Sequence, residues 1–312
     1  MLHRILFATD FSQGARHAQA YAAFLAHAYS AELTIIHVFE IYPSALYADP
    51  WSNPLLLEPL RDEISRNLDE LAANVRRCGV QATNAHVIGI ASEQLIETAR
   101  NEAVDLIIVG TQGRTGLEHV LLGSTAERVV KGAPCPVMTV RSSGPAPSHD
   151  TPITIKRIVA PTDFSDCSLD ALEYTIQMAK RFEASVTIVH VLEWASVGLD
   201  FSVAEVAEGG KVRKETERRI AELADVIRTQ GLTAESVIRG GGAPADFVLE
   251  LARERGADLI VMGTHGRRGL SRLLAGSVAE GVLRRSPCPV ITVKSPKFSP
   301  GHRRVLNAAG RA

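Results

Sequence analysis

The sequence lacks an excess of either charge, a long apolar run and any closely spaced pair of cysteines. Its 34 Lys and Arg residues balance 35 Asp and Glu residues, so no net charge favours nucleic acid or an anionic membrane. No segment approaches the roughly 18 uninterrupted apolar residues that span a bilayer, and the first residues contain no apolar core of a signal peptide. We therefore expect a cytoplasmic protein that contacts neither membrane nor nucleic acid.

The four cysteines are too far apart to form a recognised metal or redox motif. Cys78, Cys135, Cys167 and Cys288 include no CxxC pair, so the sequence predicts neither a zinc site nor a catalytic dithiol. Reduced thiols are the expectation for a cytosolic protein. Cys135 and Cys288 each lie between prolines at the start of an apolar run, and we expect them to be buried structural thiols rather than redox centres.

What the sequence does contain is an internal repeat. Residues 106–116 read LIIVGTQGRTG, and residues 259–269 read LIVMGTHGRRG. The same spacing of 153 positions relates Thr9-Asp10 to Thr162-Asp163, slips by one in the middle of each copy, and then returns. A register kept over so much of the sequence predicts two copies of one structural unit.

Length and composition place the boundaries of these copies. A protein of 312 residues is long enough for two domains of ordinary size. We predict a first domain at residues 1–141, a linker rich in Gly, Pro and Ser at 142–152, and a second domain at 153–295. The remaining residues, 296–312, carry four basic residues and no acidic one, and we expect them to form a mobile basic end.

Each copy alternates short apolar runs with segments of helical spacing. In the first copy the pattern predicts strands at 5–8, 33–38, 85–88, 106–109 and 136–141, separated by helices, with Ser12 as an N-cap. Repeated strand–helix–strand units indicate a parallel sheet with helices on both faces. Ligands of such sheets bind beyond the carboxyl ends of the strands. The candidate positions are therefore Asp10, Val38 and Gly110 in the first copy, and Asp163, Val191 and Gly263 in the second.

A glycine pattern follows the fourth strand of each copy. Its spacing is G-x2-G-x9-G-S, formed by Gly110, Gly113, Gly123 and Ser124, and again by Gly263, Gly266, Gly276 and Ser277. Such a loop can turn amide N–H groups toward an anion, and the helix that starts at the serine favours a phosphate. Arg114 and Arg267 are nearby cations. The alternative is that these glycines serve only tight turns and helix packing.

Several other side chains have both a functional and a structural interpretation. Asp10 and Asp163 could contact a ligand or cap the following helix. His37 and His190 lie inside apolar strands, where a hydrogen-bonded core histidine is expected rather than a ligand or a base. His265 lies within the glycine loop, but Gln112 replaces it in the first copy, which argues against a general base required by both copies.

Taken together, these motifs resemble the universal stress protein family. The resemblance rests on a first strand ending in Thr-Asp, a second ending in His-Val, the glycine spacing and a final Cys-Pro-Val strand, and it covers nearly the whole sequence twice. It implies two tandem five-stranded parallel-sheet α/β sandwich domains of a Rossmann-like, adenine nucleotide alpha hydrolase-like fold. In one branch it also implies ATP binding. Copy one departs from the pattern at Ala8, where copy two has Pro161, and at Gly89-Ile90-Ala91, where copy two has Gly242-Ala243-Pro244.

The resemblance also implies a role for each matching residue. Asp10 and Asp163 would lie by the ribose or by a metal ion, such as Mg²⁺, that is bound through the phosphates. Val38 and Val191 would offer backbone groups to adenine. The residues implied to bind the nucleotide, ATP or else ADP or AMP, are Thr9, Asp10, Val38, Gly110, Gly113, Arg114, Gly123, Ser124 and Thr125 in copy one, and Thr162, Asp163, Val191, Gly263, His265, Gly266, Arg267, Gly276, Ser277 and Val278 in copy two.

Three functions remain open at the level of the sequence. The first is a nucleotide-dependent stress-response or signalling protein, and the second is an enzyme, either a slow Mg²⁺-dependent ATPase or another enzyme that processes adenine nucleotides. The third is a dimerisation module without nucleotide, against which the two intact glycine patterns argue. The fifth strands, 137–140 and 290–293, have the character of sheet edges. We expect them to pair the two copies as a pseudo-dimer and to support a homodimer.

Overall fold

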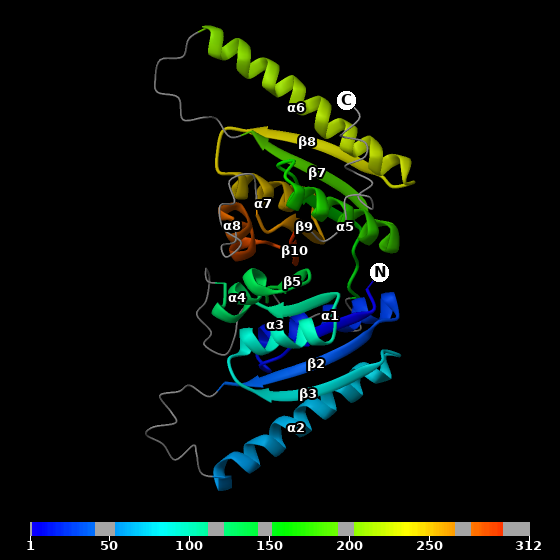
Figure 1. Ribbon diagram of the computed structural model, residues 1–312. Helices are drawn as coiled ribbons and strands as arrows, with labels where there is room; N and C mark the ends of the chain where they lie inside the picture. The colour runs from blue at the N-terminus through cyan, green and yellow to red at the C-terminus, as the bar shows by residue number, and fades with distance from the viewer. Residues whose placement is uncertain are drawn as a thin grey trace. The chain divides into compact units, whose positions relative to one another are not determined.

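The computed structural model describes residues 2–40, 54–111, 122–142, 152–192, 203–265 and 276–295. The protein divides into two compact units, Met1–Ile153 and Thr154–Ala312. Each unit contains one copy of the repeat, and its strands and helices alternate along the sequence (Figure 1).

Unit 1 is a parallel five-stranded sheet. Its strand order is β3-β2-β1-β4-β5, and every neighbouring pair within it is parallel. Right-handed crossovers in this order place α1 and α2 on one face of the sheet and α3 and α4 on the other. The elements are β1 (Arg4–Ala8), α1 (Gln13–Tyr29), β2 (Glu32–Phe39), α2 (Pro54–Arg77), β3 (Ala82–Ile88), α3 (Ala91–Asn101), β4 (Leu106–Gly110), α4 (Ser124–Gly132) and β5 (Val137–Val140).

Unit 2 repeats this arrangement with the strand order β8-β7-β6-β9-β10. Its neighbouring strands are also parallel, so the predicted α/β fold with a five-stranded parallel sheet in each copy is confirmed. The elements are β6 (Arg157–Pro161), α5 (Asp166–Phe182), β7 (Ser185–Leu192), α6 (Val203–Thr229), β8 (Ala234–Gly240), α7 (Pro244–Glu254), β9 (Leu259–Gly263), α8 (Ser277–Arg285) and β10 (Val290–Val293).

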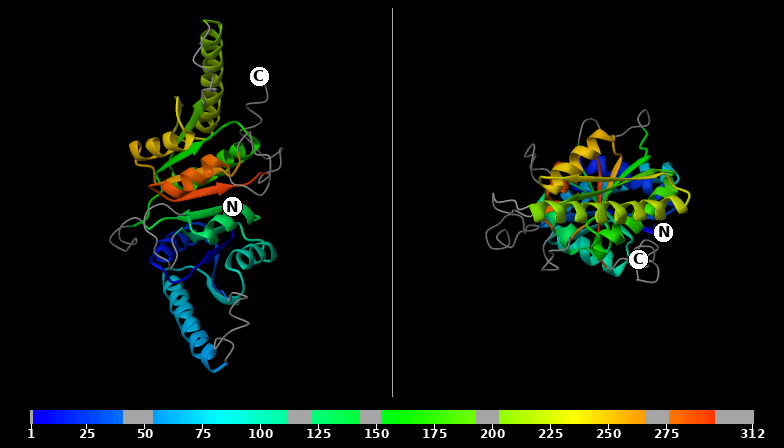
Figure 2. Two further views of the ribbon diagram at one scale, coloured as in Figure 1. Left: turned by 90° about the vertical axis from the view of Figure 1, so that its left-hand side faces the viewer. Right: turned by 90° about the horizontal axis from the view of Figure 1, so that it is seen from above.

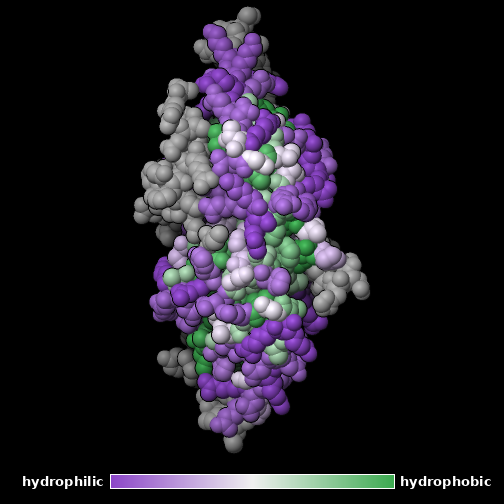
Figure 3. All heavy atoms as spheres, turned by 90° about the vertical axis from the view of Figure 1, so that its right-hand side faces the viewer, coloured by the Kyte–Doolittle hydropathy of each residue, from purple (hydrophilic) through white to green (hydrophobic). Residues whose placement is uncertain are grey.

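The central strands form the core of each unit. Leu106, Ile107 and Ile108 of β4 are fully buried, as expected for a strand covered by helices on both faces. The long helices α2 and α6 lie along the outer strands β3 and β8 of their own sheets (Figures 1 and 2). Hydrophilic residues predominate over these two helices on the face drawn in Figure 3. None of the described helices combines the length and the apolar character that a membrane crossing requires.

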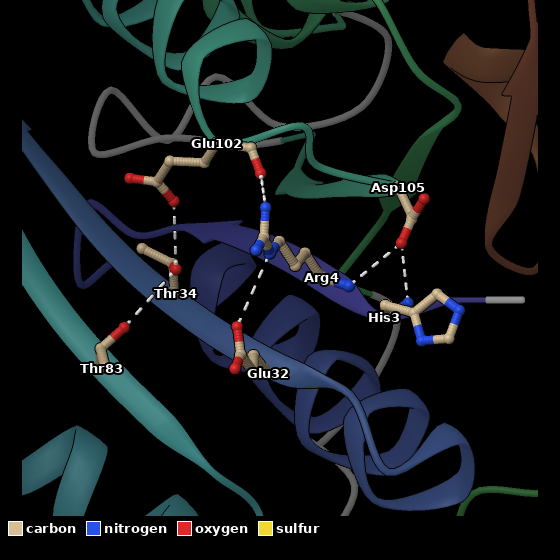
Figure 4. A network of polar contacts seen from close by, with 7 residues as sticks. All are labelled: His3, Arg4, Glu32, Thr34, Thr83, Glu102 and Asp105. Atoms are coloured by element: carbon tan, nitrogen blue, oxygen red, sulfur yellow. Dashed lines mark hydrogen bonds and ion pairs between the residues drawn. The ribbon is translucent and has the colours of Figure 1, made fainter.

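An aspartate ties together the amino ends of the first and fourth strands in each unit, at the sheet edge opposite to the strand ends discussed below. In unit 1 the Oδ2 atom of Asp105 accepts hydrogen bonds from the amides of His3 (2.7 Å) and Arg4 (3.1 Å) (Figure 4). In unit 2 the Oδ2 atom of Asp258 accepts from the amides of Lys156 and Arg157, both at 2.9 Å. These charge-assisted bonds satisfy backbone donors at the amino end of each first strand.

Replacing Asp258 by alanine should therefore destabilise unit 2 by about 2–3 kcal/mol, because two amides lose a charged acceptor. Asp258→Asn is the matched control, because it keeps one acceptor oxygen and removes only the charge, so its loss should be smaller. Urea denaturation of the full-length protein measures both free energies of unfolding. Equal stability of the alanine variant and the parent would show that solvent satisfies these amides equally well.

Candidate functional site

A tight turn follows the first strand of unit 1. Thr9 Oγ1 accepts from the amide of Phe11 at 3.0 Å, and Asp10 Oδ1 accepts from the amide of Ser12 at 3.0 Å. Ser12 then caps α1 by accepting from the amide of Ala15 at 3.2 Å, so the predicted N-cap is confirmed. The Asp10 carboxylate supports the turn that leads into the helix, while Ser12 provides the cap. Asp10 is half-buried at the carboxyl end of β1.

The corresponding turn of unit 2 has the same bonds. Asp163 Oδ1 accepts from both the amide (3.0 Å) and the hydroxyl (2.5 Å) of Ser165, which caps α5. Thr162 Oγ1 accepts from the amide of Phe164 at 3.2 Å. Phe164 and its counterpart Phe11 both adopt positive φ angles, 62° and 61°. A bulky residue in this region is strained, and such strain gathers at functional sites.

In each unit a buried histidine forms a hydrogen bond to the backbone of this turn. His37 is 5% exposed, and its Nδ1 atom lies 2.8 Å from the carbonyl oxygen of Thr9. His190 makes the same bond to Thr162 at 2.7 Å. A carbonyl oxygen only accepts, so Nδ1 carries the hydrogen in both rings. The expectation of hydrogen-bonded core histidines is confirmed, and each ring also contacts the strained phenylalanine, with centroids 4.9 and 4.8 Å apart.

The second strand presents open backbone beside this turn. β1 pairs with β2 only as far as Ala8, opposite Ile36, and the last bond runs from the Thr9 amide to the Ile36 carbonyl. Alternate residues of a strand direct their N–H and C=O groups to the same side. The backbone N–H and C=O groups of Val38 therefore point in the same direction as those of Ile36, toward β1. They lie beyond the last residue of β1 that pairs with β2, and no described residue bonds to them. Val191 has the same position in unit 2, two residues after Val189, which accepts from Thr162.

The N-cap residue of the helix that follows the glycine pattern has no side chain that could cap the helix. Gly123 is the N-cap of α4 and Gly276 that of α8, and neither makes a capping bond of the kind that Ser12 makes. The next residues, Ser124 and Ser277, are exposed. The first three amides of α4, from Ser124, Thr125 and Ala126, have no acceptor among the described residues. Those of Ser277, Val278 and Ala279 in α8 are in the same situation. Within the described part of each unit, the first turn of this helix thus has N–H groups without an acceptor and the positive end of the helix dipole, which favour anions.

The described glycines of the pattern have packing roles as well. A Cβ at Gly110 would lie 2.8 Å from the carbonyl carbon of Gly14, so the end of β4 contacts α1 backbone to backbone. The amide of Gly123 donates to the carbonyl oxygen of Thr111 at 2.9 Å, and that of Gly276 donates to Thr264 at 2.8 Å. These two amides are therefore already bonded, and the amides without an acceptor among the described residues begin one residue later.

Some predicted residues cannot be placed. Gly113, Arg114, Gly266 and Arg267 lie outside the described residues, so their contribution stays a prediction. His265 is described, and its Nδ1 atom lies 2.8 Å from the hydroxyl of Thr264. The predicted residues that the structure describes end three neighbouring strands, β2, β1 and β4, or begin α4, and their unit 2 counterparts do the same. They therefore gather at one edge of each sheet.

One residue beside the turn of unit 2 has no like counterpart in the first copy. The guanidinium carbon of Arg219, on α6, lies 4.2 Å from the ring centroid of Phe164, a cation–π distance. The matching position in the first copy is Asn67. The two sites therefore differ in a charge beside the strained turn, and a comparison of the copies with attention to unlike residues would have found it.

The cysteines are free thiols. Cys135 is buried as predicted, whereas Cys288 is half-buried as a residue. Burial of its sulfur raises the pKa of the Cys288 thiol to about 12, with Asp258 adding to the shift and a hydrogen bond with Ser286 opposing it. The thiol is therefore protonated at neutral pH, which is unfavourable for a nucleophile or a redox centre.

Comparison with known proteins identifies the fold and the repeat together. Residues 1–141 and, separately, residues 154–294 match the universal stress protein family. The protein belongs to the universal stress protein family. It is a tandem member, because each of its two units matches the family on its own, and the resemblance drawn from the motifs is confirmed to that extent.

Individual universal stress proteins show the same relationship. One from Methanocaldococcus jannaschii is 40% identical over 150 residues, covering 46% of this protein and 84% of the relative. One from Mycobacterium bovis is 27% identical over 314 residues, covering 94% of this protein and 97% of the relative. The crystal structure of a universal stress protein from Archaeoglobus fulgidus matches with a TM-score of 0.68 at 22% identity, over 93% of this protein and 98% of that one. At this identity the structural match supports the fold.

Proposed function

We propose that each unit of this universal stress protein binds an adenine nucleotide, with ATP as the expected ligand, and that the protein acts in a stress response through nucleotide occupancy. The observation that carries the proposal is the uncapped start of α4 and of α8. In both units three amides with no acceptor among the described residues, together with an exposed serine, lie at the same sheet edge as an open strand end and a half-buried aspartate. This repetition supports a ligand site over chance.

The chemical groups of the site fit the parts of the ligand. The backbone C=O and N–H of Val38 form an acceptor and donor pair that suits the amino group and ring nitrogen of adenine. The amides of Ser124, Thr125 and Ala126 suit phosphate oxygens. Val191 and the first turn of α8 would have the same functions in unit 2.

A metal ion would enter this site with the phosphates. Among the described residues no group of three or more His, Cys, Asp or Glu side chains could hold an ion alone. Mg²⁺ binds readily through one or two carboxylates together with substrate phosphates. Asp10 and Asp163 would each supply one such carboxylate, and the ion would neutralise phosphate charge.

Calorimetry on the full-length protein with ATP, ADP, AMP and adenosine tests the proposal, together with mass spectrometry of any ligand released from the purified protein. We expect two sites per molecule and at least about tenfold weaker binding of adenosine than of ATP, because adenosine makes no bond to the helix amides. Equal affinity for the two, or no binding, would contradict the proposal. Phosphate release with Mg²⁺ at about 1 per second or faster would favour the alternative of an enzyme.

The expected pairing of the two copies as a pseudo-dimer, and of the protein with a second copy of itself, stays a prediction. A molar mass of twice that of one molecule in light scattering would support the homodimer.

A further inference from the structure

The ring of Phe164 contacts two different groups at the turn of unit 2. Its centroid lies 4.8 Å from that of the His190 ring and 4.2 Å from the guanidinium carbon of Arg219. His190 belongs to β7, and Arg219 belongs to α6. The strained residue of the turn is thus in contact with two other elements of its own unit.

Arg219 differs from its neighbour on α6 in having no ion pair. Arg218 pairs with Glu215 at 2.7 Å and also with Glu222. Arg219 is half-buried and forms no ion pair with a carboxylate in the described part of the protein. A guanidinium stacks well on an aromatic face, and partial desolvation strengthens the attraction between a cation and a ring. The contact with Phe164 is therefore the main interaction that the structure gives to this charge.

The first copy has the same strained turn without the cation. Phe11 has a φ of 61°, and its ring contacts His37 with centroids 4.9 Å apart. Asn67, which is exposed and uncharged, takes the position of Arg219. No cation of the described residues lies over the Phe11 ring. The strain is thus common to both units, whereas the contact that opposes its release is seen in unit 2.

The conformation of Phe164 determines where the neighbouring site residues lie. With φ at 62°, its amide donates to Thr162 Oγ1 at 3.2 Å, and the next amide, that of Ser165, donates to Asp163 Oδ1 at 3.0 Å. Relaxation of Phe164 to a negative φ would turn its ring away from Arg219 and disrupt these bonds. Because the cation–π contact is lost in the relaxed turn, it stabilises the strained one.

We propose that Arg219 is a positioning residue of unit 2, whose contact with Phe164 holds the turn that places the Asp163 carboxylate at the site. The site of unit 2 is then better organised before a ligand arrives, so it binds that ligand more tightly than the site of unit 1 does. This second part rests on the proposed nucleotide site. The first part is independent of it and can be tested without ligand.

Amide hydrogen exchange, measured by NMR on the full-length protein without ligand, tests the first part. The variant Arg219→Asn introduces the unit 1 residue. We expect the amides of Phe164 and Ser165 to exchange about two- to fivefold faster, the factor that corresponds to loss of a cation–π contact. The amides of Phe11 and Ser12 are the internal control and should not change. Unchanged exchange at Phe164 and Ser165 would overturn the proposal.

Two further variants separate the ring contact from a general effect of charge. Arg219→Lys keeps a cation that can lie over the ring, and its exchange rates should be intermediate. In a Phe164→Leu background, the change of Arg219 to asparagine should have no further effect on the turn. An equal increase of exchange in both backgrounds would overturn the proposal, because Arg219 would then act on the turn by another route.

Calorimetry with ATP tests the second part. In Arg219→Asn one of the two sites should bind ATP about two- to fivefold more weakly, while the other keeps its affinity, and Arg219→Lys should recover part of the loss. Faster exchange at the turn with unchanged ATP affinity would overturn the connection between turn and site. A parent protein that binds no ATP would contradict the proposed function, and the exchange rates would then decide the role of Arg219 in the turn.

Discussion

A single methyl group added at Gly263 is expected to destabilise unit 2 by about 1–3 kcal/mol. Gly263 ends β9, and a Cβ there would lie 2.9 Å from the carbonyl carbon and 3.0 Å from the carbonyl oxygen of Cys167 in the first turn of α5. Backbone atoms of a capped helix cannot rotate away as a flexible side group can, so the helix and the strand must move apart. The Gly263→Ala variant therefore loses close packing over the whole contact between α5 and β9.

Gly210→Ala is the matched control, and its expected effect has the opposite sign. Gly210 lies within α6, is exposed, and an added Cβ there would have no atom within 4 Å apart from its chain neighbours and the backbone of its own helix. Alanine should therefore stabilise the helix by up to about 1 kcal/mol through its higher helix propensity. Denaturation by urea, followed by circular dichroism, measures both variants on the full-length protein. A Gly263→Ala protein as stable as the parent would show that β9 and α5 can separate without cost.

Close backbone contacts of this kind make glycine variants unsuitable as a test of ligand binding. Gly110 has an equivalent contact with Gly14, and a Cβ at Gly123 would lie 3.1 Å from the Thr111 carbonyl oxygen. A larger residue at either position changes the packing of its unit as well as the approach of a ligand. Loss of binding in such a variant would not separate the two causes, so a test of the site needs an exposed residue without a packing role.

Local sequence was sufficient for the architecture because the strands are buried on both faces. A run such as Leu106–Val109 is apolar at every position, and such runs alternating with helical spacing predict a parallel sheet. The repeat then supplied each element twice. Ser12 was readable as the N-cap of α1 because capping depends on residues close in sequence.

Features that depend on distant residues were not predictable in this way. Asp105 bonds to amides about 100 positions away, and nothing in its neighbourhood indicates that contact. The positive φ of Phe11 follows from bonds of Thr9 and Asp10 that close the turn, although a phenylalanine disfavours that conformation. The bonded state of the Gly123 amide likewise depends on the position of β4. The spacing predicted a candidate site, whereas tertiary contacts determine which of its amides are already bonded.

A carboxylate placed at Ser124 should stabilise α4 and weaken nucleotide binding at the same time. Ser124 is exposed in the first turn of a helix whose N-cap is a glycine, so Ser124→Asp adds a favourable interaction with the helix dipole of about 0.3–1 kcal/mol. The same charge would lie beside the phosphates of the proposed ligand. Two unit charges about 4 Å apart near a protein surface repel by up to about 4 kcal/mol, and we expect at least about tenfold weaker binding of ATP to unit 1.

The opposite signs of the two effects make this variant decisive for the position of the phosphates. Ser124→Asn is the control of matched shape without charge, and Ser277→Asp repeats the test on α8 in unit 2. Calorimetry measures the affinity and thermal unfolding measures the stability of each variant. A Ser124→Asp protein that is more stable than the parent and binds ATP with unchanged affinity would place the phosphates away from α4. Weaker binding with higher stability cannot arise from misfolding, and it would assign the phosphates to the free amides of this helix.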